Sequence, residues 1–451
     1  MSQTSVTTHD QLLAAVSGGA TDIHVKGSIE SLPMITLPPG VCLSGGSLSF
    51  RGAGLRLTAD NKISETRLVC PETETAISND QSRPGLGHMV LRDMSVDGQV
   101  LLLAGGTVRD GHVHVENLTI LSADVRARAE RPHGYGVNAL QGAFTLWNRH
   151  VDTDSVVSAT LRGISVGSEG RPVRGSGVFV GGRGDRSGTP VGGRVEVDLL
   201  QTGTIIVDGG IAPGTADLIS GGVFVQTGAV IRRVINAGPV TTLGANDMVL
   251  DNWGEVDEWT SQAAITSRGP SGIGFVNFGT LQKLTVAAPI ETWGAGARGF
   301  NLYDGTLESA TFDSVITHGD GAVGIQITKP LPDLTVENGI RTTGSEGVSL
   351  VRGKQVVLKA TAFSLKPGGS LRRLRVGGGI ATSGANVVSL EIGGDIESMS
   401  IEGGVTAHGQ GSDTVRIHGD SKIIDGLGLV RAISEPTADN TLNPAFEGLP
   451  E

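Results

Sequence analysis

Three acidic residues near the middle of the chain have the type and spacing that cleavage of a glycosidic bond needs. Asp251, Glu255 and Asp304 are predicted to lie on one outward face of a repeating structure. Two carboxyl groups beside one sugar share the work when one stays protonated as the acid and the other is ionised. Asp251 and Asp304 are two repeats apart, about 10 Å at the strand spacing, which is near the range of about 6.5–9.5 Å for inverting enzymes. Glu255 is the alternative, closer partner.

A column of aromatic residues accompanies these acids. Trp253, Phe278 and Tyr303 recur at the repeat length, and Asn301 lies beside them. A row of ring faces is a surface on which a sugar chain stacks, so these four residues are the predicted substrate-binding positions on this face. The alternative is ordinary packing between neighbouring repeats or under a covering loop.

A second candidate region lies between residues 126 and 194, which contain ten arginines and only five acidic residues. Arg131, His133, Tyr135 and Trp147 are the polar and aromatic types that hold a sugar or an anion. With a uronate substrate, the arginine would neutralise the substrate carboxylate, and His133 or Tyr135 would carry the proton in a β-elimination. The alternative is a set of solvated surface loops.

These candidates depend on a repeat that runs from residue 240 to residue 409. Each repeat has a glycine four positions after a β-branched residue, and the glycines are 25 residues apart except for one interval of 40. A fixed period of this length indicates stacked, similar units. The glycines are Gly244, Gly269, Gly294, Gly319, Gly344, Gly384 and Gly409.

Within each repeat, apolar residues alternate with other residues at a period of two, which predicts strands. The sixth residue after each glycine is apolar in all seven repeats and is predicted to point inward. The following residue, such as Asp251 or Asn301, is predicted to point outward. Two residues after the apolar position, Asn252 and Asn277 are predicted to form a buried asparagine ladder. The inward residues are Leu250, Phe275, Phe300, Ile325, Leu350, Leu390 and Val415.

Two insertions interrupt the repeat and are predicted to leave it as loops, where solenoids often carry function. One lies within residues 210–220, and the other, rich in lysine and arginine, lies near residues 354–374.

Coils of this length, marked by glycine turns, predict an all-β parallel solenoid with strands about 4.8 Å apart. The chain resembles the right-handed, single-stranded parallel β-helices of the pectin-lyase-like superfamily, because Thr7–Val16 is similar to their capping helix and Ala20–Ile29 to their first strand. The resemblance implies one domain over residues 1–451, with an N-terminal cap (1–25), loop-rich coils (126–220), regular coils (221–420) and a C-terminal cap or tail (424–451). It also implies side-by-side homotrimers as one form of assembly.

The catalytic motifs of the superfamily are absent. The sequence lacks the paired aspartates with Gly-His-Gly and Arg-Ile-Lys of polygalacturonases, the Asp-Pro-His-Glu of mannuronan epimerases and the histidine motif of pectate lyases. The resemblance therefore implies the architecture and transfers no catalytic residue.

Composition excludes several classes of partner. The formal net charge of −11 argues against generic binding of nucleic acid or an anionic membrane. No apolar run is long enough to span a membrane, and the first residues lack a signal-peptide pattern, so a cytoplasmic location is expected. Cys42 and Cys70 are expected to be small buried residues, and His112 and His114 lack a third metal ligand, so we expect no cofactor and no metal.

Two functions of different classes remain. The first is a carbohydrate-active enzyme acting on an oligo- or polysaccharide, by hydrolysis or transfer at the carboxylates or by elimination at residues 126–150. The second is a non-catalytic solenoid for binding or assembly. The insertions beside acidic and aromatic residues favour the enzyme.

We predict that the protein releases new reducing ends without unsaturated products from an oligosaccharide, and that Asp251→Asn or Asp304→Asn abolishes this activity. The check is a screen of neutral and uronate oligosaccharides that follows reducing ends and unsaturated-product absorbance together. Unsaturated products that survive both substitutions would move the site to the Arg/His region. The absence of product from any substrate would favour the binding function.

Overall fold

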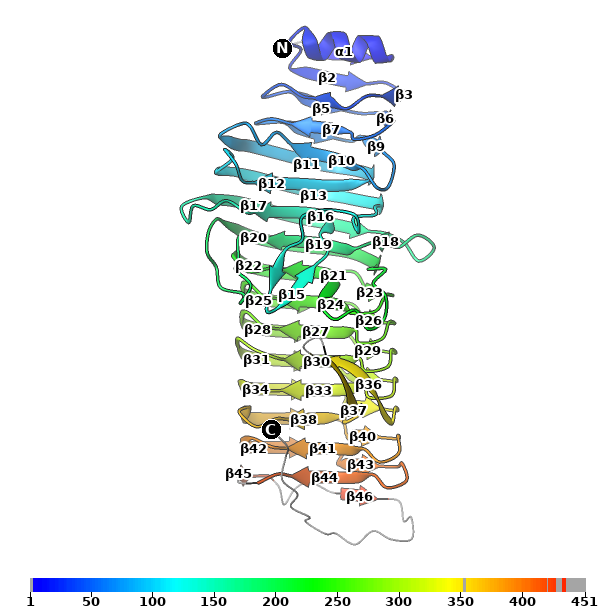
Figure 1. Cartoon of the computed structure of the whole chain (residues 1–451), viewed down its shortest axis with the longest axis vertical. Helices are drawn as coiled ribbons and strands as arrows, with labels where there is room; N and C mark the ends of the chain where they lie inside the picture. Colours follow the sequence, from blue (N-terminus) through cyan, green and yellow to red (C-terminus); the bar gives the residue numbers. More distant parts are fainter. Residues whose placement is uncertain (1–2, 352–353, 420, 427–431, 435–451) are drawn as a thin grey trace. The chain divides into compact units, whose positions relative to one another are not determined.

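Segments in which apolar residues alternate with other residues are strands in the computed structural model, which describes residues 3–351, 354–419, 421–426 and 432–434 (Figure 1). The chain divides into two compact units. Unit 1 comprises residues 1–210, 218–238 and 253–255, and unit 2 comprises residues 211–217, 239–252 and 256–451. Among the described residues, no helix has the length and apolar character needed to cross a bilayer.

In unit 1 the strands of successive coils pair in parallel and form two sheets. The strands of the first sheet are β1 (Thr4–Val6), β2 (Asp22–Val25), β3 (Ser28–Leu32), β5 (Cys42–Ser44), β6 (Ser47–Phe50), β8 (Lys62–Ser64), β9 (Arg67–Val69), β11 (Gly85–Asp97), β13 (Asp110–Ser122), β17 (Val156–Val166), β18 (Val173–Arg174), β20 (Arg194–Asp208) and β22 (Ala229–Asn236). Those of the second are β4 (Ile35–Thr36), β7 (Leu55–Leu57), β10 (Thr75–Asn79), β12 (Gln99–Ala104), β16 (Gly142–Asn148), β19 (Ser176–Gly181) and β21 (Leu218–Val225). A small hairpin, β14 (His133–Gly134) and β15 (Val137–Ala139), joins β21.

Unit 2 also has two parallel sheets, and each regular coil gives two strands to the first and one to the second. The strands of the first are β23 (Val240–Thr242), β25 (Glu255–Ser261), β26 (Ile265–Ser267), β28 (Thr280–Val286), β29 (Ile290–Thr292), β31 (Thr306–Phe312), β32 (Val315–Thr317), β34 (Pro330–Val336), β35 (Ile340–Thr342), β39 (Ser370–Val376), β40 (Ile380–Thr382), β42 (Asp395–Ile401), β43 (Val405–Ala407), β45 (Ile423–Asp425) and β46 (Ala432–Ser434). Those of the second are β24 (Asp247–Asn252), β27 (Ile273–Asn277), β30 (Arg298–Leu302), β33 (Val323–Ile327), β38 (Phe363–Leu365), β41 (Val388–Ile392) and β44 (Asp413–Ile417).

The all-parallel coils of each unit confirm the predicted fold class, a parallel β-helix. In unit 2 the predicted inward residues Leu250, Phe275 and Phe300 pair in register from coil to coil and are fully buried. Burying a side chain of this size stabilises a fold by roughly 1.5–3 kcal/mol. The asparagine ladder is also confirmed, because Asn252 Nδ2 donates to Asn277 Oδ1 at 2.8 Å in the buried interior.

The repeating glycines are explained by the stacking of the turns. A side-chain carbon at Gly319 would lie 2.0 Å from the carbonyl oxygen of Gly294, and one at Gly294 would lie 1.9 Å from that of Gly269. The same contact recurs through Gly344, Gly384 and Gly409. Since each glycine meets backbone and not a movable side chain, any larger residue would push the coils apart. We call this column of stacked turns the glycine ladder.

A short helix begins the chain, as predicted, and its buried apolar face is narrow. Helix α1 spans His9–Ser17, and the Thr8 hydroxyl caps it by accepting a hydrogen bond from Gln11 N–H at 3.3 Å. Leu12 is buried, but Leu13 is exposed. The predicted C-terminal cap or tail, 424–451, lies largely outside the described residues.

The 15-residue surplus of the 40-residue interval is a β-hairpin that begins earlier than the predicted insertion near 354–374. Strands β36 (Glu346–Val351) and β37 (Lys354–Lys359) pair antiparallel. Phe363 then takes the inward position that was predicted for Leu350, because it pairs with both Ile325 and Leu390. The sequence prediction assigned the column to Leu350 by counting one period and did not detect that the hairpin starts directly after the turn glycine.

We predict that Gly319→Ala lowers the free energy of unfolding by about 1–3 kcal/mol, since the new methyl group overlaps the Gly294 carbonyl. Chemical denaturation followed by circular dichroism measures this change. The control is Gly170→Ala, because nothing lies within 4 Å of the position where its side-chain carbon would be placed. Equal effects of the two substitutions would contradict the role of the glycine ladder.

Candidate functional site

The face of unit 2 that was predicted to carry the acidic site is buried. Asp251 and Asn301 follow the inward residues Leu250 and Phe300, so they point to the opposite, outward side of β24 and β30. Both have an exposed fraction of 0%, and Val276 between them has 1%. Asp251 and Asn301 thus point outward, as predicted, but they are covered and do not reach solvent. Segments that cross the outside of the coils explain the burial.

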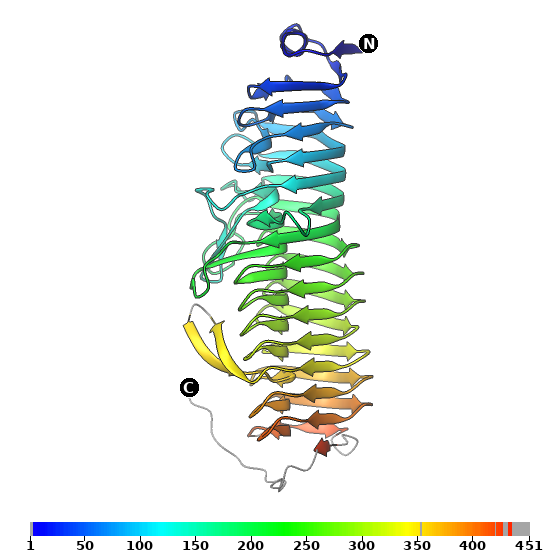
Figure 2. The same cartoon turned by 90° about the vertical axis from the view of Figure 1, so that its right-hand side faces the viewer.

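One covering segment is the hairpin β36–β37, which lies outside the coils on the side of β30 (Figures 1 and 2). Ser349 donates a hydrogen bond from its hydroxyl to the Gly296 carbonyl at 2.8 Å, and Leu350 N–H donates to the Ser271 hydroxyl at 3.1 Å. Gly296 has φ of 65°, and a side-chain carbon there would lie 2.5 Å from Ser349 Cα. The hairpin therefore rests directly on the turns that lead into β27 and β30.

The other covering segment is the first insertion, residues 211–217. Asn246 Nδ2 donates to the Thr215 carbonyl at 2.8 Å, next to the start of β24. The Gln355 side chain of the hairpin reaches Gly214 of the same segment. The two insertions predicted from the broken repeat therefore meet over one face of unit 2.

Arg298 is a buried cation on this face. It is only 3% exposed and is in register with Ile273 and Val323 on the neighbouring coils. Burial lowers the pKa of its guanidinium to about 10, while the nearby Tyr303 acts in the opposite direction. The group therefore stays positively charged at neutral pH. Sequence reasoning missed Arg298, because its neighbours in register, Ile273 and Val323, are apolar.

At the end of the same strands, Phe278 and Tyr303 stack with their ring centres 5.0 Å apart and their planes 25° apart. Stacking of this kind covers the ring faces that point toward each other, so it leaves less face for a sugar than the predicted platform needed. Next to the pair, Asp304 accepts a hydrogen bond from Gly305 N–H at 3.0 Å and forms an ion pair with Lys329 at 2.9 Å. The Asp304 side chain is 49% exposed, whereas Asp251 is fully buried.

Trp253, the first residue of the predicted aromatic column, belongs to unit 1 and is only 3% exposed. Its ring packs edge-on against Phe224 at 4.8 Å and Tyr135 at 5.3 Å. A side-chain carbon at Gly134 would lie 2.8 Å from the indole. Two predicted regions therefore meet, because the segment around Tyr135 covers Trp253. The tryptophan is a packing residue and not an open stacking surface.

The remaining predicted residues of unit 1 make separate contacts. The His133 carbonyl accepts a hydrogen bond from Gln226 Nε2 at 3.0 Å, and Trp147 Nε1 donates to the Gly182 carbonyl at 3.0 Å. Arg131 is exposed and donates to the Arg126 carbonyl at 3.4 Å. Glu255 is exposed at the start of β25. The predicted elimination set of Arg131, His133 and Tyr135 thus does not converge on a common partner in these contacts.

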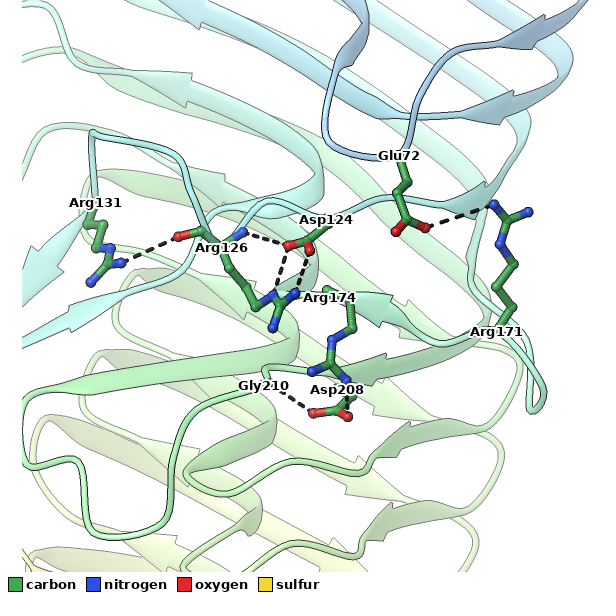
Figure 3. Close-up of polar contacts among 8 residues, drawn as sticks. All are labelled: Glu72, Asp124, Arg126, Arg131, Arg171, Arg174, Asp208 and Gly210. Atoms are coloured by element: carbon green, nitrogen blue, oxygen red, sulfur yellow. Dashed lines mark hydrogen bonds and ion pairs between the residues drawn. The ribbon is translucent and has the colours of Figure 1, made fainter.

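Ion pairs neutralise several arginines of the basic window, and Figure 3 shows those of Arg126, Arg171 and Arg174. Arg126 binds Asp124 through two hydrogen bonds of 2.9 and 2.5 Å. Arg174 pairs with Asp208, whose other oxygen accepts from Gly210 N–H at 2.8 Å. The Asp208 carboxylate comes from β20, outside the window of residues 126–194.

Arg171 also forms ion pairs with acidic residues outside the window, and these residues are farther away in the sequence. It lies 3.2 Å from Asp97 and 3.9 Å from Glu72, two carboxylates contributed by earlier coils. Asp97 also accepts from Arg67 at 2.8 Å and from Ser122 at 2.7 Å. Part of the local excess of arginine that the sequence shows, Arg171 and Arg174, is therefore balanced by acids from outside the window. A free anion site does not follow from it.

A groove of about 580 Å³ lies on the outward face of the first coils of unit 1. Successive strands place Cys42, Lys62, Val90 and His114 in one register column, and Ser44, Ser64 and Arg92 in the next. We call this surface the basic groove. Its lining is Asp22, Cys42, Leu43, Ser44, Lys62, Ile63, Ser64, His88, Val90, Arg92 and His114.

His88 and His114 of the basic groove are close to a third histidine, His112. The rings of His88 and His112 stack with their centres 5.0 Å apart, and His112 Nδ1 lies 2.9 Å from the Ser158 hydroxyl. Burial lowers the pKa of His112, and the neighbouring His88 and His114 lower it further. The sequence drew attention to His112 and His114, but Lys62, His88 and Arg92 join them only through the parallel register.

Cys70 is not suited to act as a nucleophile. Both cysteines are free thiols, and burial together with the nearby acids Asp97 and Glu74 raises the pKa of Cys70 to about 12. Cys42 lies in the lining of the basic groove. Across the described ranges, no group of three histidine, cysteine or acidic side chains is arranged to hold a metal ion.

A further polar cluster lies on β38, β41 and β44 of unit 2. Glu391 accepts hydrogen bonds from Ser364 at 2.5 Å and Lys366 at 2.8 Å, and His418 Nε2 lies 3.1 Å from its other oxygen. Burial opposes ionisation, but the Lys366 charge and these hydrogen bonds outweigh it and lower the pKa of Glu391 to about 2. The cluster stabilises an ionised carboxylate and is not arranged as a nucleophile with a base.

Comparisons of the chain with protein families, curated proteins and solved structures find no match.

We predict that Glu391 makes unfolding pH-dependent. Since its folded pKa of about 2 lies below the ordinary value of 4.5, its stabilisation is complete above pH ~4.5 and is lost as the pH falls toward 2. Glu391→Gln is expected to remove on the order of 3 kcal/mol at pH 7 and to flatten this part of the pH profile. Denaturation curves between pH 2 and 7 test this, with the exposed Glu397→Gln as control. An unchanged profile in the Glu391 variant would contradict the assignment.

Proposed function

We propose that this chain binds an acidic oligosaccharide along the basic groove of unit 1. The observation that carries the proposal is that Lys62, His88, Arg92 and His114, from three successive strands, line one concave surface. Asp22 supplies the carboxylate of this lining. On a protein whose net charge is −11, a local set of basic side chains marks a surface suited to an anion.

The dimensions and chemistry of the groove support an oligosaccharide with carboxylate groups. Its volume of about 580 Å³ falls in the range of small-molecule sites, which is about 300–1,000 Å³. Lys62 and Arg92 would pair with substrate carboxylates, and the Ser44 and Ser64 hydroxyls would bond sugar hydroxyls. Strands spaced about 4.8 Å apart repeat these groups along the coil axis, which suits a polymer of repeating units.

Elimination is a second candidate for the same groove. His88 and His114 lie beside the permanent cations Lys62 and Arg92. A β-elimination needs a base to remove the proton next to a carboxylate, and a cation to neutralise that carboxylate. Both types of group are present on this surface, and the appearance of unsaturated products would distinguish this reaction from binding alone.

Glycosidic cleavage by Asp251, Glu255 and Asp304 stays a prediction. The contrast between buried Asp251 and half-exposed Asp304 agrees with an acid and a base in different environments. A substrate would reach Asp251 only after the covering segments move. For this reason binding in the groove is the better supported function.

We also propose that the chain belongs to the pectin-lyase-like superfamily and has the right-handed coils of that group. The all-parallel coils and helix α1 at the start of unit 1 support this assignment. Assembly as a homotrimer stays a prediction that follows from the same resemblance.

We predict that an oligogalacturonate binds and that Lys62→Gln weakens its Kd roughly tenfold, since a hydrogen bond to a charged group contributes about 1.5 kcal/mol. Isothermal titration calorimetry with a neutral oligosaccharide for comparison measures both the binding and its weakening. Lys26→Gln, an exposed lysine of unit 1 that is not part of the groove lining, is the matched control. Equal affinity for the charged and neutral sugars would refute the proposal.

A further inference from the structure

The covered face of unit 2 contains polar groups that its own folding does not satisfy. Among the described residues, Arg298 Nε and both side-chain polar atoms of Asn301 are buried without a hydrogen-bond partner. Arg298 and Asn301 are both on β30 and have exposed fractions of 3% and 0%. These groups are independent of the basic groove, which belongs to unit 1.

A buried guanidinium whose Nε has no hydrogen-bond partner destabilises the folded state. In the part of the chain that the structure describes, Tyr303 is the titratable group whose charge affects the pKa of Arg298. No carboxylate of the described residues affects that pKa. A charge in an apolar surrounding and a buried amide without a hydrogen-bond partner both destabilise the folded state. Ile273 and Val323, which flank Arg298 in register, offer no compensating polar group. Such a site gains stability when an oxyanion binds to it.

The contacts between the hairpin β36–β37 and this face of unit 2 allow the hairpin to open. Ser349 is its only described side chain that is fully buried. Val348 and Val357, which are cross-strand partners, are 52% and 67% exposed. Leu350, Val351, Val356 and Leu358 are only partly buried, so none of the described apolar side chains of the hairpin is fully buried, and the hydrogen bonds from Ser349 and Leu350 to the turns anchor it. Segments with few apolar contacts open at low free-energy cost.

We propose that Arg298, Asn301 and Tyr303 form a site for a small oxyanion, the carboxylate or phosphate group of a ligand, and that the paired strands β36 and β37 are its lid. The guanidinium binds two oxygens of such a group, and the amide and phenol bond the others. The ligand enters when the hairpin lifts, and the hairpin closes over it. Because a bound oxyanion stabilises the closed form, it also slows opening of the hairpin.

The first test measures thermal stability of the full chain at constant ionic strength, with inorganic phosphate, galacturonate or neutral galactose. Wild-type protein is expected to gain several degrees in Tm with phosphate, galacturonate or both, and nothing with galactose. A response to only one of the two anions identifies the oxyanion as phosphate or carboxylate. The absence of any response to both anions would overturn the proposal.

Arg298→Met separates a ligand site from a structural arginine. We expect this variant to lose the anion response and, without anion, to melt above wild type, because a buried unpaired charge has been removed. Arg341→Met, the same change at an exposed arginine of unit 2, is expected to keep the response. Lys62→Gln, in the groove of unit 1, is also expected to keep it. An Arg298 variant that keeps the full response, or an Arg341 variant that loses it equally, would refute the site.

Hydrogen exchange on the wild-type protein tests the lid without any substitution. The responding anion is expected to slow exchange of the backbone amides of β36 and β37 at least threefold, while amides of β41, another strand of unit 2, stay unchanged. Equal exchange with and without the anion would overturn the assignment of the hairpin as the lid.

Discussion

Contact between the backbones of successive turns is the constraint on which this structure depends. In unit 2 the carbonyl oxygen of one turn glycine lies where the next glycine would carry its side chain, so the turns stack at the spacing that the strand hydrogen bonds require. With the turns fixed, Leu250, Phe275 and Phe300 fall into register, and so do the side chains on the opposite face. The core and the candidate sites are both consequences of this spacing.

In unit 2 the buried polar residues lie beneath the segments that interrupt the repeat. A regular coil leaves its outward face open to water, whereas the hairpin β36–β37 and residues 211–217 cover β24, β27 and β30. That cover turns Asp251, Arg298 and Asn301 from surface residues into buried ones. The basic groove of unit 1 arises differently, from regular pairing alone, because consecutive strands bring Lys62, Arg92 and His114 together.

The periodic part of the fold could be predicted from the sequence, because a strict period of glycine and apolar residues reports directly on stacking. The inward positions of Phe275 and Phe300 and the asparagine ladder follow from that period. The burial of Asp251 could not be predicted in this way, since its cover comes from two insertions, residues 211–217 and the hairpin β36–β37, that are distant from it in the sequence. The arginine-rich window was interpreted as basic because Asp97 and Asp208, which neutralise Arg171 and Arg174, lie outside it. Pairing between distant coils is not visible in local composition.

The glycine ladder also limits how such a chain changes over evolutionary time. Loss or duplication of 25 residues removes or adds one whole turn of the stack and preserves every column on either side. Deletion of a single residue within a strand would instead rotate all later side chains of that strand between core and solvent. The 40-residue interval shows the tolerated exception, because its extra residues leave directly after Gly344 and the columns resume at Phe363. New binding surfaces can therefore be acquired at turns without altering the apolar interior.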